Sequence, residues 1–140
     1  METQTENKQE ISKEMALAQF LEIDLEEAEK LIEDGNYIVY DDNEADLACA
    51  ERIREDLWAF NYDFLCEYSS AIANIPKKSF RELQEKLCES FNDAILAMVG
   101  DRLADLIEDA IGLDGRGHFL SGYDEHEFEL IGNYYAYRNN

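Results

Sequence analysis

Basic residues are scarce in this chain. Its 140 residues include 12 Lys plus Arg against 33 Asp plus Glu, which gives a formal net charge of −21 at pH 7. Proteins that bind DNA or RNA use Lys and Arg to displace the counterions of the phosphate backbone. The charge therefore disfavours direct binding of a nucleic acid, and it disfavours an anionic membrane surface for the same reason.

Long apolar runs and paired cysteines are also lacking. The chain has no run of about 18 apolar residues, the length needed to span a bilayer. The polar residues 1–10 are predicted to be a mobile leader and contain no export signal. Cys49, Cys66 and Cys88 are odd in number and lack CxxC spacing, which indicates neither a disulfide framework nor a zinc site. We expect buried thiols in a cytoplasmic protein.

Apolar residues are nevertheless abundant enough for a core. Hydrophobic residues make up 46% of the chain and aromatic residues 11%, which distinguishes it from disordered acidic tails. The sequence predicts one acidic domain over residues 11–140.

Helical periodicity extends from residue 11 to residue 112. It predicts short helices over 12–22 and 24–35, the second with Asp24 and Glu27 as a capping box. A third and longest helix is expected after Asp41 or Asn43, either of which can form a capping box because Glu44 or Asp46 lies three residues on. Its apolar stripe continues to Phe64. Residues 69–74 are predicted to be a loop. A fourth helix follows Pro76 for about five turns, with a capping box at Ser79, and a last helix ends at Gly112.

Extended structure is expected between the second and third of these helices and again after the last one. Residues 36–40, between a glycine and two aspartates, predict a short strand. Residues 118–123, 128–131 and 133–138 predict further strands, with turns at 124–127 and 132–133. The fold class is therefore α+β, with four or five helices and a small antiparallel sheet formed mainly by the C-terminal region.

The acidic residues are distributed unevenly. Residues 22–67 contain 16 acidic and three basic side chains, a net charge of −13 in 46 positions. Such a surface can serve solubility alone, or its carboxylates can imitate a nucleic-acid backbone, since 21 charges correspond to roughly 36 Å of duplex. The residues expected to bind a basic partner on this surface are Glu26, Glu29, Glu33, Asp41, Asp42, Glu44, Asp46, Glu51, Glu55 and Asp56.

A tyrosine-rich strand offers a different surface. Tyr135 and Tyr137 alternate along residues 133–138, and a strand with one buried face would leave some of these rings exposed to a partner. This is the basis of an alternative hypothesis, a protein–protein interaction or assembly module that could form a homodimer. Packing of the rings onto helices is the competing interpretation.

Chemistry-bearing residues form no recognised catalytic or metal-binding motif. His118 and His126 lie near Asp124, but their spacing matches no zinc signature. The acidic run that begins at Asp41 lacks the ligand series of an EF-hand. The glycines around Arg116 match no phosphate-binding loop, and we interpret them as a turn. We therefore expect no enzyme activity, cofactor or metal.

Two segments resemble a family of small acidic proteins encoded by bacteriophages, prophages and plasmids. They are Asp42-Asn43-Glu44-Ala45-Asp46 with Leu57-Trp58-Ala59-Phe60, and the C-terminal Asp114-Gly115-Arg116-Gly117-His118-Phe119-Leu120-Ser121-Gly122-Tyr123-Asp124 with Tyr134-Tyr135-Ala136-Tyr137-Arg138. The family has no settled activity. The resemblance implies a phage-type protein in the cytoplasm of a bacterium. By class it favours an inhibitor resembling a DNA mimic, which binds the nucleic-acid-binding surface of a basic host or defence protein.

Overall fold

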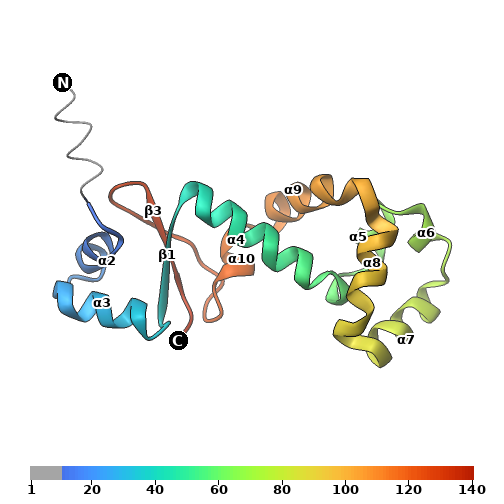
Figure 1. The fold of residues 1–140 in the computed structure, drawn as a ribbon, viewed down its shortest axis with the longest axis horizontal. Helices are drawn as coiled ribbons and strands as arrows, with labels where there is room; N and C mark the ends of the chain where they lie inside the picture. Colours follow the sequence, from blue (N-terminus) through green and yellow to red (C-terminus); the bar gives the residue numbers. More distant parts are fainter. Residues whose placement is uncertain (1–10) are drawn as a thin grey trace, which may run out of the picture. The chain divides into compact units, whose positions relative to one another are not determined.

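The computed structural model describes residues 11–140, so the leader expected at 1–10 lies outside the described residues (Figure 1). The described chain forms two compact units. We call residues 11–49 with 116–140 the sheet unit, and Ala50–Gly115 the helical unit. The core cluster of the sheet unit draws all its side chains from that unit. The single acidic domain expected over residues 11–140 remains a prediction.

The sheet unit combines two helices with the sheet and a short third helix. Its elements are α2 (Lys13–Leu21), α3 (Leu25–Glu33), β1 (Tyr37–Asp41), the first turns of α4 (Asp42–Glu55), α10 (Arg116–Leu120), β2 (Phe128–Leu130) and β3 (Tyr134–Arg138). The sheet is antiparallel in the order β1-β3-β2, with Val39 opposite Ala136 and Phe128 also opposite Ala136. The predicted α+β class is confirmed.

One face of this sheet carries the core. Helix α2 contacts all three strands and α3 contacts β1 (Figure 1). Buried side chains from these helices and strands form the cluster Ala16, Leu17, Ala28, Val39, Leu130 and Ala136. Alternation along β3 places Ala136 and Tyr134 on this face, and so places Tyr135 and Tyr137 on the other.

The helical unit contains the end of α4 and a series of short helices. These are the 3₁₀ helix η1 (Leu57–Ala59), α5 (Tyr62–Cys66), α6 (Ser70–Ala73), α7 (Lys77–Leu87), the 3₁₀ helix η2 (Cys88–Phe91), α8 (Asn92–Val99), the 3₁₀ helix η3 (Gly100–Arg102) and α9 (Leu103–Asp114). Its core includes Ile53, Phe80 and Ile95, all fully buried. No helix within residues 11–140 is long and apolar enough to cross a membrane.

The third predicted helix is shorter than expected. Helix α4 is the longest in the described chain, but it ends at Glu55, so the stripe from Ile53 to Phe64 is spread over α4, η1 and α5. Side chains from α7 and α8 replace the missing helical hydrogen bonds. Asn92 accepts from the Trp58 amide (3.0 Å) and donates to the Arg54 carbonyl (2.9 Å), while Gln84 donates to the carbonyls of Trp58 and Phe60.

The fourth predicted helix is also broken. Helix α7 begins at Lys77, directly after Pro76, so Ser79 lies inside it and caps nothing. It ends at Leu87 because Cys88 has φ 49° and ψ −128°, which stops the helix before η2 and α8. Together with the break after Glu55, this gives the chain more helical segments than the four or five predicted.

Two further segments differ from prediction. The expected loop at 69–74 contains α6, because the Ser69 hydroxyl accepts a hydrogen bond from the Ile72 amide and caps a helical turn. The expected strand at 118–123 contains α10 instead. The predicted buried state holds for Cys49, whereas Cys88 is exposed in the turn after α7.

Candidate functional site

Helix α3 carries three of the predicted acidic residues on one exposed face. Ala28 is buried toward the core, and the opposite side of the helix carries Glu26, Glu29 and Glu33, all exposed. These three lie at i, i+3 and i+7 and therefore share one face. Asp24 caps the helix with an extended backbone, although its side chain makes no capping hydrogen bond.

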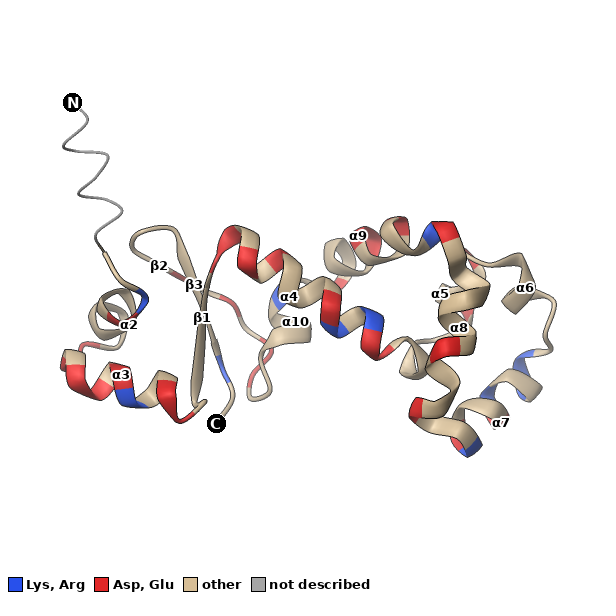
Figure 2. Cartoon of the chain, viewed as in Figure 1, with Lys and Arg blue, Asp and Glu red and all other residues tan. Residues whose placement is uncertain are grey.

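The α3 carboxylates lack ionic partners within the described chain. In residues 11–140, no Lys, Arg or His nitrogen lies within 4.0 Å of any of them. Lys30, also exposed, is the one basic residue among 11 acidic residues in 22–49. Figure 2 shows this asymmetry as red turns of α3 interrupted by one blue segment. The face therefore has charge available for a partner.

The carboxylates of Asp41 and Glu44 make contacts within the chain. The Asp41 carboxylate accepts from the Glu44 amide (2.8 Å), and the Glu44 carboxylate accepts from the Asp41 amide (2.9 Å), which forms the capping box predicted for this helix. Glu44 also pairs with Lys13 at 2.8 Å. The bond to Lys13 and the bond from the Asp41 amide hold the pKa of Glu44 below its ordinary value.

Asp42 and Asp46 are partly neutralised by Arg116. The guanidinium lies 2.9 Å from Asp42, 3.0 Å from Asp46 and 2.7 Å from Glu127, and only 11% of the arginine side chain is exposed. Burial alone would lower the pKa of Arg116, but the bonds to Glu127 and Asp42 raise it overall, so the charge is permanent. This cluster binds α10 to the start of α4 and leaves less free charge there than predicted.

The two predicted tyrosines lie at this cluster. Arg116 lies over the ring of Tyr135, 4.7 Å from its centroid, and Tyr135 is half-buried. Tyr137 is fully buried and donates a hydrogen bond to Glu127. Burial and that bond raise the pKa of Tyr137 well above its ordinary value. Tyr137 as a partner-binding residue was therefore wrong, because both faces of β3 are covered rather than one.

Glu51, Glu55 and Asp56 belong to the helical unit and not to the unit that carries α3. Glu51 and Glu55 are exposed on α4, whereas Asp56 is half-buried after its last turn. Arg52 and Arg54 lie between them in the sequence and dilute their charge. The predicted residues thus divide between the two units, and three of them share one exposed face of α3.

The histidines do not form a shared site. Nδ1 of His118 lies 2.7 Å from Glu125, while the ring of His126 stacks on Phe128. Asp124 accepts hydrogen bonds from Ser121 and the His126 amide, which shapes the turn after α10. Within residues 11–140, no group of three or more His, Cys, Asp or Glu side chains is placed to hold a metal ion.

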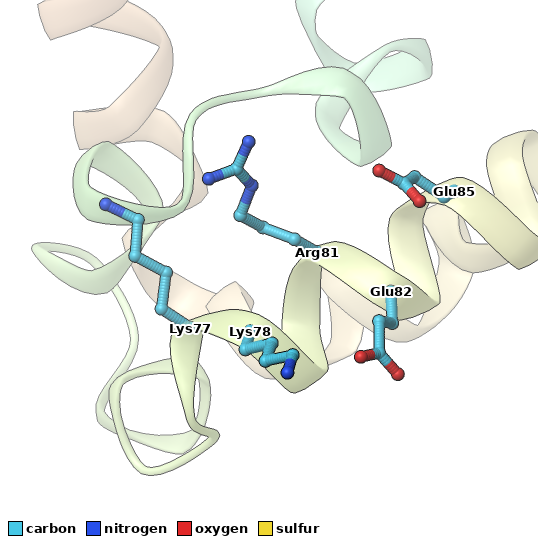
Figure 3. Close-up of a pocket in the computed structure, with 5 residues that line it drawn as sticks. All are labelled: Lys77, Lys78, Arg81, Glu82 and Glu85. Atoms are coloured by element: carbon cyan, nitrogen blue, oxygen red, sulfur yellow. The ribbon is translucent and has the colours of Figure 1, made fainter.

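A basic hollow of about 450 Å³ lies along α7. Figure 3 shows Lys77 and Arg81 extending on one side of the helix, and Lys78 and Glu82 on another. Lys77 is paired with Asp63 at 2.9 Å. Helix α7 contains four basic and two acidic side chains, which makes it the least acidic helix of the helical unit.

Arg116 is the organising residue that sequence reasoning missed. It was interpreted as part of a glycine-rich turn, whereas it holds three carboxylates and a tyrosine ring. The available signal was one arginine in an acidic segment, since a lone cation there attracts several carboxylates. Comparisons with family models, curated proteins and solved structures found no match for the chain.

Proposed function

We propose that this chain is a non-enzymatic binding protein whose α3 face binds a basic surface of another protein. That basic surface is of the kind that otherwise holds a nucleic-acid backbone. The observation that carries the proposal is the set of exposed α3 carboxylates without ionic partners in residues 11–140. Such a surface attracts cationic partners through its electrostatic field.

The sheet unit supplies most of the required charge. It contains 16 acidic and four basic residues, whereas the helical unit contains 14 and seven. Within the sheet unit, the Arg116 cluster and the Lys13–Glu44 pair remove charge from the start of α4. The α3 face is therefore the principal contact in the proposal, and Asp42 and Asp46 are secondary contacts.

The resemblance to phage proteins favours a host or defence protein as the partner. In this proposal the chain acts in the bacterial cytoplasm as a DNA-mimic-like inhibitor of a host or defence protein. Partner and inhibitor associate by charge, so binding weakens as salt screens the exposed carboxylates.

Affinity capture from bacterial lysate tests this function. We expect the retained proteins to bind duplex DNA, to be displaced by added duplex DNA, and to be lost at about 0.5 M salt, where screening is strong. The variant Glu26→Gln/Glu29→Gln/Glu33→Gln should retain less than a tenth of the wild-type amount. The matched control is Glu82→Gln/Glu85→Gln/Glu89→Gln, which removes the same charge from exposed positions of the helical unit.

The control variant should retain its partners at the wild-type level. Equal losses in both variants would contradict the proposal, because net charge and not the α3 face would then determine binding. Retention that resists both salt and DNA would contradict it as well. The alternative of an assembly module built on Tyr135 and Tyr137 has lost its main support, since Tyr137 is fully buried.

A further inference from the structure

A second acidic surface lies in the helical unit, where a hollow of about 520 Å³ opens between two helical segments. Phe64, Glu67 and Tyr68 come from α5 and the residues after it, at i, i+3 and i+4. Helix α9 contributes Glu108, Asp109, Gly112 and Leu113, again at helical spacing. We call this the acidic hollow.

The carboxylates of the acidic hollow form no ion pair within residues 11–140. Glu67, Glu108 and Asp109 are all exposed, and in residues 11–140 no basic nitrogen lies within 4.0 Å of them. The Tyr68 hydroxyl donates to Asp109 and fixes that carboxylate against the ring. This bond and burial raise the pKa of Tyr68 to about 12, and the carboxylate of Glu67 adds to the effect.

Aromatic and aliphatic groups complete the lining. The rings of Phe64 and Tyr68 lie 5.2 Å apart, and the Tyr68 ring already holds the guanidinium of Arg102 at 5.3 Å from its centroid. Leu113 is 73% exposed, the highest exposure among the large apolar side chains of the described residues. An exposed leucine beside aromatic rings suits the aliphatic stem of a long side chain.

We propose that the acidic hollow binds an arginine side chain of a partner protein. A guanidinium matches both parts of the lining, because it bonds carboxylates in a planar fork and stacks on an aromatic ring such as that of the half-buried Phe64. A lysine ammonium is more strongly hydrated and matches only the carboxylates well. The basic hollow along α7 has the opposite charge and no aromatic lining, so it does not compete for the same group.

This inference goes beyond the proposed function, since the acidic hollow lies in the helical unit and α3 in the sheet unit. An experiment can therefore disprove one of these two proposals without disproving the other. A test needs only the full chain and a small probe, N-acetyl-arginine methylamide. The neutral probe is the corresponding citrulline derivative, which has nearly the same shape without the charge, and the lysine derivative tests the preference for a guanidinium.

Titration followed by ¹⁵N–¹H NMR should show saturable shifts at the amides of Tyr68, Gly112 and Leu113. We expect the arginine probe to bind more tightly than the lysine probe, and the citrulline probe to cause no such shifts. Glu67→Gln/Glu108→Gln should raise the Kd of the arginine probe by about tenfold. Glu82→Gln/Glu85→Gln, with the same change in charge, should leave the Kd unchanged, as should the triple glutamine variant of α3.

Leu113→Ala separates packing from charge. It should weaken binding of the arginine probe without lowering the melting temperature, because the side chain is mostly exposed. Equal binding of the citrulline probe, an unchanged Kd in Glu67→Gln/Glu108→Gln, or shifts confined to α3 would overturn the inference. If the double variant loses its dispersed spectrum, Glu108→Gln alone gives the same comparison and leaves the Tyr68–Asp109 bond in place.

Discussion

Cys88 occupies a backbone conformation that suits glycine. Its φ of 49° and ψ of −128° nearly equal the 56° and −126° of Gly100, and both residues join an α-helix to a 3₁₀ helix. An L side chain is strained there. Cys88→Gly should therefore raise the free energy of unfolding by about 1 kcal/mol, as measured by urea denaturation. Gly100→Ala should lower it, and a loss of stability in Cys88→Gly would contradict this explanation.

Gly117 shows the opposite constraint, a lack of space. A Cβ atom at this position would lie 2.5 Å from the Glu125 carbonyl oxygen and 2.9 Å from the Glu127 amide nitrogen, both backbone atoms. Gly117→Ala should lower the free energy of unfolding by about 2 kcal/mol or more in thermal or urea denaturation. Gly112→Ala is the control. Nothing lies within 4 Å of its Cβ position, so we expect a gain of about 0.5 kcal/mol.

At the scale of elements, the capping box of α4 links folding to pH. Asp41→Ala should cost about 1 kcal/mol, since it removes the acceptor for the Glu44 amide. The pKa of Glu44 is lowered in the folded state from 4.5. The negative charge of Glu44 therefore stabilises the folded protein at pH values above the pKa of this group in the unfolded chain. This stabilisation is lost as the pH falls through the lower pKa of the folded state.

Glu44→Gln isolates that contribution. The wild type should be the more stable protein at about pH 7, and the difference should be smaller at about pH 3. Urea denaturation at both pH values measures the difference. A constant difference would mean that the Lys13–Glu44 pair adds nothing through charge.

Asn92 explains why α4 ends where it does. Its amide group donates to the Arg54 carbonyl and its oxygen accepts from the Trp58 amide. Asn92→Asp replaces the donor with an acceptor facing a carbonyl, so we expect a loss of about 2 kcal/mol in urea denaturation. Asn61→Asp is the matched control, because only the side-chain oxygen of Asn61 is used, and it accepts hydrogen bonds from the backbone amides of Asp63 and Phe64. A similar loss in both variants would contradict this role of the Asn92 donor.

These elements show how far local sequence reasoning extends. The strand at Tyr37–Asp41, the Asp41–Glu44 capping box and the turn before β3 follow from nearby residues, and all were predicted. The break after Glu55 depends on side chains that come 26 and 38 residues later than the carbonyls they bind, which periodicity does not report. The exposure of the α3 carboxylates was predictable from amphipathic spacing. The burial of Tyr137 was not, since it depends on distant Arg116 and Glu127.

At the scale of the whole molecule, net charge acts against folding. With 33 acidic and 12 basic residues, repulsion among exposed carboxylates destabilises the compact state. Added NaCl should therefore raise the melting temperature, measured by calorimetry, because salt screens the repulsion among exposed carboxylates. A melting temperature that falls with salt would show that attractive ion pairs outweigh the repulsion.

The sheet unit is built from two stretches of chain separated by the 66 residues of Ala50–Gly115. Its central strand, β3, comes from the second stretch, while β1 comes from the first. During synthesis on a ribosome, β1 therefore has no strand to pair with until residues 134–138 emerge. By that time every residue of the helical unit has already been synthesised. The order of translation therefore lets the helical unit form first, and leaves β1 as an unpaired strand edge in the nascent chain.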